Sequence, residues 1–180
     1  MASDSSLGSF INQFEGGNRQ HRYDVSMQMP AGISTPGANN FNRFFVRAVS
    51  LPPSQVNPIR VPYRGRILKW PGDRVYFPWT MRILDQNSGK NRSLWNDFHR
   101  WSDTINDHVT NISSDDWNNF TTDWTISQIN TKGDTIKTIK LIDCWPTVVG
   151  PITLDSNAID TLVEFTVTIE YQWYEVEGIN

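Results

Sequence analysis

The sequence has 180 residues and only one cysteine, Cys144. A single cysteine cannot form an intramolecular disulfide, and it cannot build a cysteine-rich metal site. The first residues lack the basic region and apolar run of a secretory signal, and no apolar stretch approaches the roughly 18 residues of a membrane span. We therefore expect a protein that is made and folded in a reducing cytoplasm.

Motifs for catalysis are also lacking. The sequence contains no Walker loop, no GxGxxG phosphate loop and no GxSxG nucleophile elbow, and its three histidines lack metal-ligand spacing. Carboxylates are plentiful, but Glu164 and Glu170 alternate with threonines like the polar face of a strand, which solvation explains more simply than a catalytic pair. We predict that the protein is not an enzyme and uses no cofactor or metal ion.

Large aromatic side chains and an uneven charge distribution are present instead. Eight tryptophans and nine phenylalanines suit a core or an interface. The first 100 residues hold 13 Lys/Arg against 6 Asp/Glu, a net +7, whereas residues 101–180 hold 3 Lys against 13 Asp/Glu, a net −10. The split indicates either opposite charges on different surfaces, which suits self-association, or a mixture of both signs over the folded surface.

Hydrophobic periodicity predicts the elements of the N-terminal half. A short helix, capped by Ser3 or Asp4 and ended by two glycines, carries its apolar face on Leu7, Phe10, Ile11 and Phe14. Strict alternation predicts a strand at residues 21–29, a Pro- and Gly-rich loop follows at 30–40, and 42–51 is the second strand.

The stretch VPYRGRILKWPGDR, residues 61–74, mixes basic, aromatic, proline and glycine residues. It belongs to a proline-rich segment, and proline favours sheet edges or extended arms. RGR is a candidate hairpin turn and WPGD a second turn. The stretch could grip a nucleic acid, could be turn chemistry alone, or could be a stiff arm for a neighbouring subunit; the acidic second part of the chain argues against the first.

The remaining pattern is mostly β. Residues 74–84 read as a strand with five residues on one face: Val75, Phe77, Trp79, Met81 and Ile83. Residues 92–109 have helical spacing, at Leu94, Phe98, Trp101 and Ile105. A loop at 113–117 precedes two strands around a turn at 132–134, an irregular segment at 146–157, and one long strand at 160–177. We predict a mainly antiparallel β-sandwich or barrel with one flanking α-helix.

The residues and their order resemble one protein family. Residues 49–84 combine a Leu-Pro pair, VPYRGR, PGDR and an aromatic strand ending in WT; the tryptophan-containing LWNDFHRW helix follows, and then CWPTVVGPITLDSN before VEFTVTIEYQWYE. This arrangement, from about Tyr23 to Glu175, resembles the tail-tube proteins of contractile-tailed, T-even-type bacteriophages.

The resemblance implies a role in a virion. Tail-tube proteins form hexameric rings that stack into a tube inside a contractile sheath; the tube houses the tape-measure protein and then guides DNA into the host without sequence-specific binding. The expected partners are other copies of the chain, the sheath protein, the baseplate or tube initiator and the tail terminator, with assembly in the host cytoplasm. We expect one domain over residues 1–180, with a helical segment at 1–20 and an extended arm at 51–74.

Site residues are proposed on this basis. We expect inter-ring or ring-to-sheath contacts from the charged side chains of the arm, namely Arg64, Arg66, Lys69, Asp73 and Arg74. Glu164 and Glu170 would face the lumen, where their acidity would repel DNA, or else simply meet outside water. The alternatives are a tube-initiating baseplate subunit, the tube of a related injection or secretion system, and, more distantly, a carbohydrate-binding β-sandwich.

Overall fold

The computed structural model describes residues 9–10, 14, 17–30, 33, 45–85 and 93–177. The elements of this part are β1 (Tyr23–Ser26), β2 (Val46–Val49), β3 (Gln55–Tyr63), β4 (Arg66–Val75), β5 (Trp79–Leu84), α3 (Leu94–Ile105), α4 (Trp117–Phe120), β6 (Thr122–Ile129), β7 (Thr135–Val149), β8 (Glu164–Glu170) and β9 (Trp173–Val176). Every strand pair is antiparallel, so the predicted mainly antiparallel β fold with a flanking helix is confirmed.

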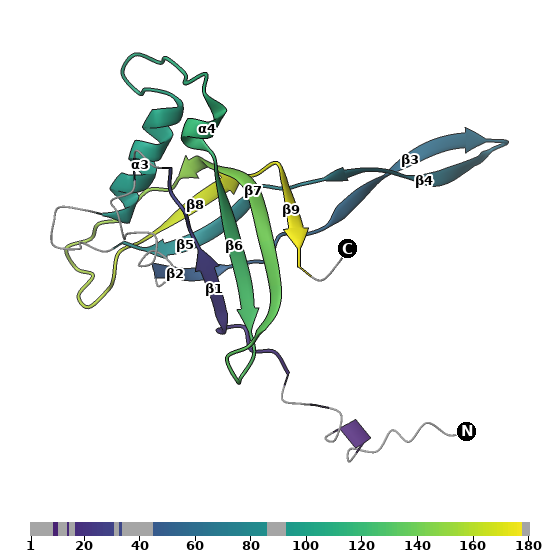
Figure 1. Cartoon of the computed structure of the whole chain (residues 1–180), viewed down its shortest axis with the longest axis horizontal. Helices are drawn as coiled ribbons and strands as arrows, with labels where there is room; N and C mark the ends of the chain where they lie inside the picture. Colours follow the sequence, from purple (N-terminus) through teal and green to yellow (C-terminus); the bar gives the residue numbers. More distant parts are fainter. Residues whose placement is uncertain are drawn as a thin grey trace.

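Seven of the strands form one sheet in the order β1-β6-β7-β8-β5-β2, and β9 pairs with β7 beside it. The long strand β7 joins the two halves of this sheet, because its residues up to Cys144 pair with β6 and β9, and those from Trp145 onward pair with β8. Asp143 lies at this change of partner with a φ of 54°. The β3–β4 hairpin extends away from the sheet to one side (Figure 1).

Aromatic side chains dominate the core beneath the helix. Trp124 of β6 lies against Trp79 of β5 and Trp101 of α3, with ring centroids 6.1 and 5.8 Å apart, and Phe98 lies against Phe165 of β8 at 6.1 Å. The buried indole N–H groups are hydrogen-bonded; those of Trp101 and Trp124 donate to the carbonyls of Phe120 and Gln28. Polar atoms are therefore buried here without the cost of losing their partners.

The helix at residues 92–109 is confirmed as α3, which begins after its N-cap Ser93. The Ser93 hydroxyl accepts a bond from the amide of Asn96, as expected for an N-cap. The predicted face is buried at Leu94, Phe98 and Trp101, and Ile105 packs against the same core. The predicted loop at 113–117 leads into the single turn α4, which was not expected.

Three strand predictions need correction. The strand expected over 74–84 begins only at Trp79, because Val75 belongs to β4 and Phe77 is exposed between the two strands. The segment expected to be irregular from residue 146 instead continues β7 through Pro146, which lies at a shift of register where the ladder tolerates proline. The long C-terminal strand is broken after Glu170. Before the break, β8 pairs with β5 and with the second half of β7; after it, β9 pairs with the first half of β7.

Two N-terminal predictions fall largely outside the described residues. Of the helix expected near residues 4–14, Ser9 and Phe10 are helical, and the amide of Phe14 donates to the carbonyl of Phe10. Most of the predicted loop at 30–40 likewise lies outside the described residues. The first strand is confirmed as β1, with alternate burial continuing through Met27 and Met29.

Candidate assembly interface

The β3–β4 hairpin is the part of the described structure that reaches furthest from the sheet (Figure 1). Its two strands pair only with each other, in register from Gln55 opposite Val75 to Tyr63 opposite Arg66. An isolated two-stranded hairpin is marginally stable in water, because half of each strand's backbone and both of its faces stay wet. Such a hairpin gains stability when another surface covers it.

A two-residue turn at Arg64 and Gly65 closes the hairpin, as RGR predicted. Both residues have positive φ, 45° and 78°, which is the pattern of the type I′ turns that suit the twist of antiparallel strands. Gly65 adopts this conformation without strain since it has no Cβ. The turn fixes which side chains lie opposite one another along the ribbon.

The second predicted turn, at WPGD, is wrong. Trp70, Pro71, Gly72 and Asp73 all lie inside β4, where the pairing continues past them. A Cβ on Gly72 would lie 2.6 Å from the backbone oxygen of Asn57, so glycine here permits a close approach of two strands at a register shift. Gly72 therefore serves the pairing of β3 with β4 and does not turn the chain.

The register sorts the hairpin's side chains onto two unlike faces. Directly opposed residues share a face in an antiparallel pair, and faces alternate along each strand. One face therefore carries Ile59 with Trp70, Val61 with Leu68, and Tyr63 with Arg66; the other carries Arg60 with Lys69, Pro58 with Pro71, and Pro62 with Ile67. The first face is almost wholly apolar, and the second combines cations with prolines.

The apolar face is uncovered. Trp70 is 71% exposed and Leu68 58%, and their cross-strand neighbours Ile59 and Val61 are about half exposed. Large apolar side chains gathered on one exposed surface mark an interaction site. The charges of the arm stand out in the sequence and this face was not predicted, although the alternation of Ile59, Val61 and Tyr63 before the turn is a signal for it.

The charged residues predicted in the arm all lie exposed on the hairpin. Arg64 and Arg66 flank the tip, and the Arg64 guanidinium lies 5.4 Å from the centre of the Tyr63 ring. Lys69 lies on the cationic face, Asp73 is near the base, and Arg74 donates a hydrogen bond to the hydroxyl of Ser54 at 3.0 Å. Among the described residues, none of the hairpin's basic side chains has an acidic partner.

Glu164 and Glu170 lie on the outward polar face of β8. Phe165, Val167 and Ile169, which alternate with them, are buried. Glu164 is half-buried between two arginines, 2.9 Å from Nη1 of Arg47 and 3.8 Å from Nε of Arg82. The charge of Glu164 is therefore compensated within the chain, which the sequence did not indicate, since Arg47 and Arg82 come from other strands.

Nothing in the described residues assembles a catalytic or metal centre. No group of three or more His, Cys, Asp or Glu side chains there is placed to hold a metal ion. Cys144 is buried, and burial raises the pKa of its thiol well above the ordinary range, which leaves it inert as a nucleophile. Within the same residues, no helix is long and apolar enough to cross a bilayer.

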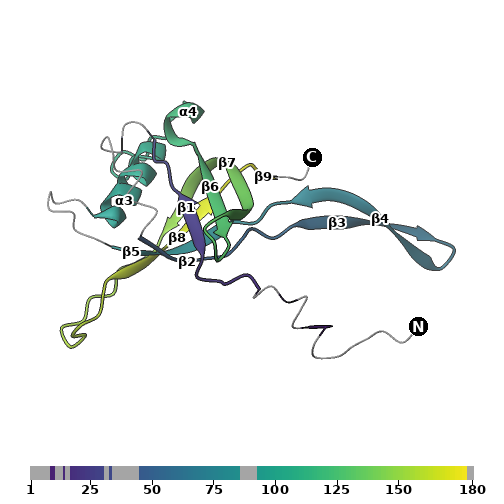
Figure 2. The ribbon, with the colours of Figure 1, turned by 60° about the horizontal axis from the view of Figure 1, so that its bottom comes forward.

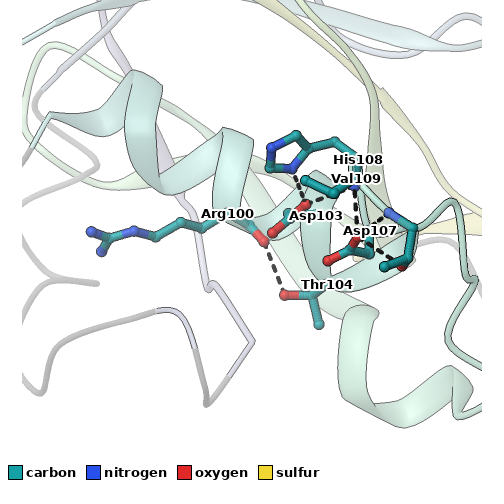
Figure 3. A network of polar contacts seen from close by, with 7 residues as sticks. Arg100, Asp103, Thr104, Asp107, His108 and Val109 are labelled. Carbon is teal, nitrogen blue, oxygen red and sulfur yellow. Dashed lines mark hydrogen bonds and ion pairs between the residues drawn. The ribbon is translucent and has the colours of Figure 1, made fainter.

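A network of hydrogen bonds joins the C-terminal end of α3 to the residues that follow it (Figure 3). Asp103 accepts bonds from the backbone amide and the ring Nδ1 of His108, and Asp107 accepts from the backbone amides of Val109 and Thr110 and from the Thr110 hydroxyl. These bonds lower the pKa of both aspartates. The hydrogen bond and the charge of Asp103 raise the pKa of His108.

The titration of His108 is a test of this network. Its raised pKa means that the pair stabilises the folded state at mildly acidic pH and loses this effect as the pH rises through the folded-state pKa. The lowered pKa of Asp103 sets the lower limit, because the effect is also lost as the pH falls through it. We expect an NMR titration of the monomer to place His108 above 6.5. Asp103→Asn should lower this midpoint and Asp134→Asn, in a distant turn, should not; an unchanged midpoint in Asp103→Asn would contradict the pairing.

Comparison with known proteins identifies the family. The family model for phage tail tube proteins matches residues 18–177. The chain belongs to the phage tail tube protein family. The tail tube protein of Serratia phage KSP90 is 25% identical over 171 residues, which cover 95% of each chain. The family is structural, so the prediction that the protein is not an enzyme is confirmed, and a tail tube protein is a component of the virion tail.

Solved structures share the fold of this tail tube protein. A chain in the sheath/tube terminator of the extracellular contractile injection system PVC superposes with a TM-score of 0.63 at 18% identity, covering 91% of this chain and 98% of that one. A chain in the baseplate of the anti-feeding prophage gives 0.64 at 13% identity, covering 89% and 95%. A chain in the PVC sheath-tube complex gives 0.57 at 18%, covering 97% and 100%.

Proposed function

We propose that this tail tube protein forms hexameric rings that stack into the inner tube of a contractile phage tail. The chain acts as one domain over residues 1–180, with a helical segment at 1–20 and an extended arm at 51–74. The tube houses the tape-measure protein before ejection and then conducts DNA into the host. It is assembled in the host cytoplasm on the baseplate initiator, within the sheath, and is closed by the terminator.

The observation that carries this proposal is the β3–β4 hairpin. Its apolar face is exposed and its cations lack acidic partners among the described residues, so the chain offers a surface that another molecule completes. In a ring or stack the contacts are heterologous, with one patch meeting a different patch on the next copy. Arg64, Arg66, Lys69, Asp73 and Arg74 are our candidates for this contact.

The polar face of β5 and β8 is our candidate for the lumen. Thr80 lies opposite Thr168 there, Arg82 opposite Thr166, and the flanking carboxylates are Glu164 and Glu170. Exposed arginines alone would bind DNA phosphates in a salt-dependent way. Glu164 neutralises one of its two arginines and Glu170 adds a second carboxylate to the face, so the face offers DNA little net positive charge, which suits a conduit through which DNA slides.

Assembly of the purified protein tests the proposal. We expect concentrated protein to form rings and stacked tubes in negative-stain micrographs, either alone or after addition of the tail initiator. Dilute protein should stay monomeric, since association depends on concentration. Monomers alone at high concentration with the initiator present would contradict the proposed function.

A further inference from the structure

The loop between β7 and β8, residues 150–163, is a second exposed apolar surface. Leu154 and Ile159 are about four-fifths exposed and Leu162 is 68% exposed. This loop and the tip of the β3–β4 hairpin lie at opposite ends of the molecule in both views (Figures 1 and 2). A chain therefore cannot cover its own loop with its own hairpin.

The loop is held in shape by its backbone. At its start the amide of Gly150 donates to the carbonyl of Thr166 at 2.7 Å, and at its end the carbonyl of Val163 accepts from the amide of Asp85 at 2.9 Å. Between these anchors, Oδ1 of Asp155 accepts from the amide of Asn157. A loop ordered before contact loses little conformational freedom on binding, which favours its use as a docking surface.

The loop also borders an open hollow of about 640 Å³. Its lining includes Leu154 and Leu162 from the two limbs of the loop, together with the acidic residues Asp155 and Glu164. Glu164 is compensated by its arginines, so Asp155 and the nearby Asp160 are the available charges. The sequence has no Lys or Arg after Lys140, so nothing close in the sequence neutralises them.

The hairpin tip has the complementary chemistry. Arg64 and Arg66 bracket the turn without acidic partners in the described chain, and Tyr63, Ile67 and Leu68 beside them are each more than half exposed. The tip is narrow and convex, whereas the loop is hollowed. An apolar contact with cations on one side and carboxylates on the other favours one partner and one orientation of that partner.

We propose that the hollow of loop 150–163 receives the hairpin tip of the next copy of the chain, with Arg64 and Arg66 facing Asp155 and Asp160. The contact joins opposite ends of two identical molecules, so it repeats from copy to copy. This inference rests on the proposed function and names the surface that the hairpin binds.

Disulfide trapping tests the contact in assembled tubes. A chain carrying both Arg66→Cys and Asp155→Cys should give a ladder of cross-linked species larger than dimers on a non-reducing gel, since each copy then links to two neighbours. Either cysteine alone should stop at dimers. Cys144 is buried and should not compete. The matched control pairs Arg66→Cys with Asp116→Cys, an exposed aspartate in the loop before α4, and should give no ladder.

A charge exchange gives an independent measurement. Asp155→Lys with Asp160→Lys should lower the fraction of protein that sediments as assembled tubes at least about tenfold. A chain that also carries Arg64→Glu and Arg66→Glu should regain most of this fraction, because opposite charges then face each other again. Asp155→Asn with Asp160→Asn keeps the loop's hydrogen-bond acceptors and should weaken assembly less. Asp115→Lys with Asp116→Lys should neither block assembly nor rescue the arginine variant. Circular dichroism confirms that each variant is folded.

The outcomes distinguish a failure of this inference from a failure of the proposed function. If the wild-type chain forms no rings or tubes, the proposed function fails and the inference fails with it. If tubes form but the Asp116 pair gives the ladder, or the Asp155/Asp160 lysine variant assembles like the wild type, the hairpin binds elsewhere. The inference is then overturned while the proposed function stands.

Discussion

Replacing Arg64 and Arg66 together by glutamate is expected to abolish tube growth while leaving the monomer folded. Both side chains are exposed at the hairpin tip, and the hairpin's strands pair with no strand of the seven-stranded sheet. If they face acidic groups on the next copy, each reversal turns an attraction into a repulsion, and like charges brought together at an interface cost several kcal/mol. Sedimentation and negative-stain microscopy at matched concentrations should show free subunits or isolated rings.

The control for this change keeps the positive charge. Arg64→Lys with Arg66→Lys should still assemble, although less well, because lysine lacks the planar fork of arginine. The two variants share the same exposed positions, so a general loss of folding would reduce the thermal stability of both. Tubes of normal length and yield from the glutamate variant would remove these two residues from the proposed interface.

The elements that the sequence predicted well are those in which one face is buried. In α3, Leu94, Phe98 and Trp101 face the core, and in β5 and β8 the buried residues alternate strictly with exposed or half-buried ones. Such a pattern is dictated by burial itself, because a shift of one residue in a strand would move its whole apolar set into water. Local sequence is enough to detect it.

The predictions of secondary structure that were wrong share a different cause. Pro71 and Gly72 were expected in a turn and Pro146 in an irregular segment, but all three lie within strands, since a partner strand tolerates them at register shifts that the sequence does not reveal. The break after Glu170 arises because β8 pairs with β5 and the second half of β7, whereas β9 pairs with the first half of β7. Both depend on which distant segment lies alongside, and local composition carries little information about that.

The same dependence on distant segments explains why only part of the candidate interface was predicted. The basic residues around VPYRGR stand out in the sequence, whereas the apolar face becomes evident only when the register places Trp70 opposite Ile59 and Leu68 opposite Val61. The compensation of Glu164 likewise needs arginines from β2 and β5. Chemistry concentrated in one segment can be read directly, but chemistry assembled across strands needs the fold.

Trp124→Ala is expected to destabilise the monomer by about 3–5 kcal/mol, which is the usual cost of deleting a buried large aromatic side chain. Trp124 is fully buried among Trp79, Phe98 and Trp101, and its indole N–H donates to the carbonyl of Gln28 at 2.7 Å. The change removes these contacts and one of the two hydrogen bonds that this carbonyl accepts, since the Thr122 hydroxyl donates the other. The melting temperature should fall by roughly 10 °C in a domain of this size.

Trp70→Ala is the matched control, because the same side chain is deleted at a position that is 71% exposed. It should leave the monomer's melting temperature within a few degrees of the wild type, yet weaken assembly, since Trp70 belongs to the uncovered face of the hairpin. Both melts are best measured in the Arg64→Glu/Arg66→Glu background, where association adds nothing to the apparent stability. A large loss of monomer stability in Trp70→Ala with unchanged assembly would mean that this tryptophan serves its own chain. The opposite result separates the tryptophan that holds the subunit together from the one that holds subunits to each other.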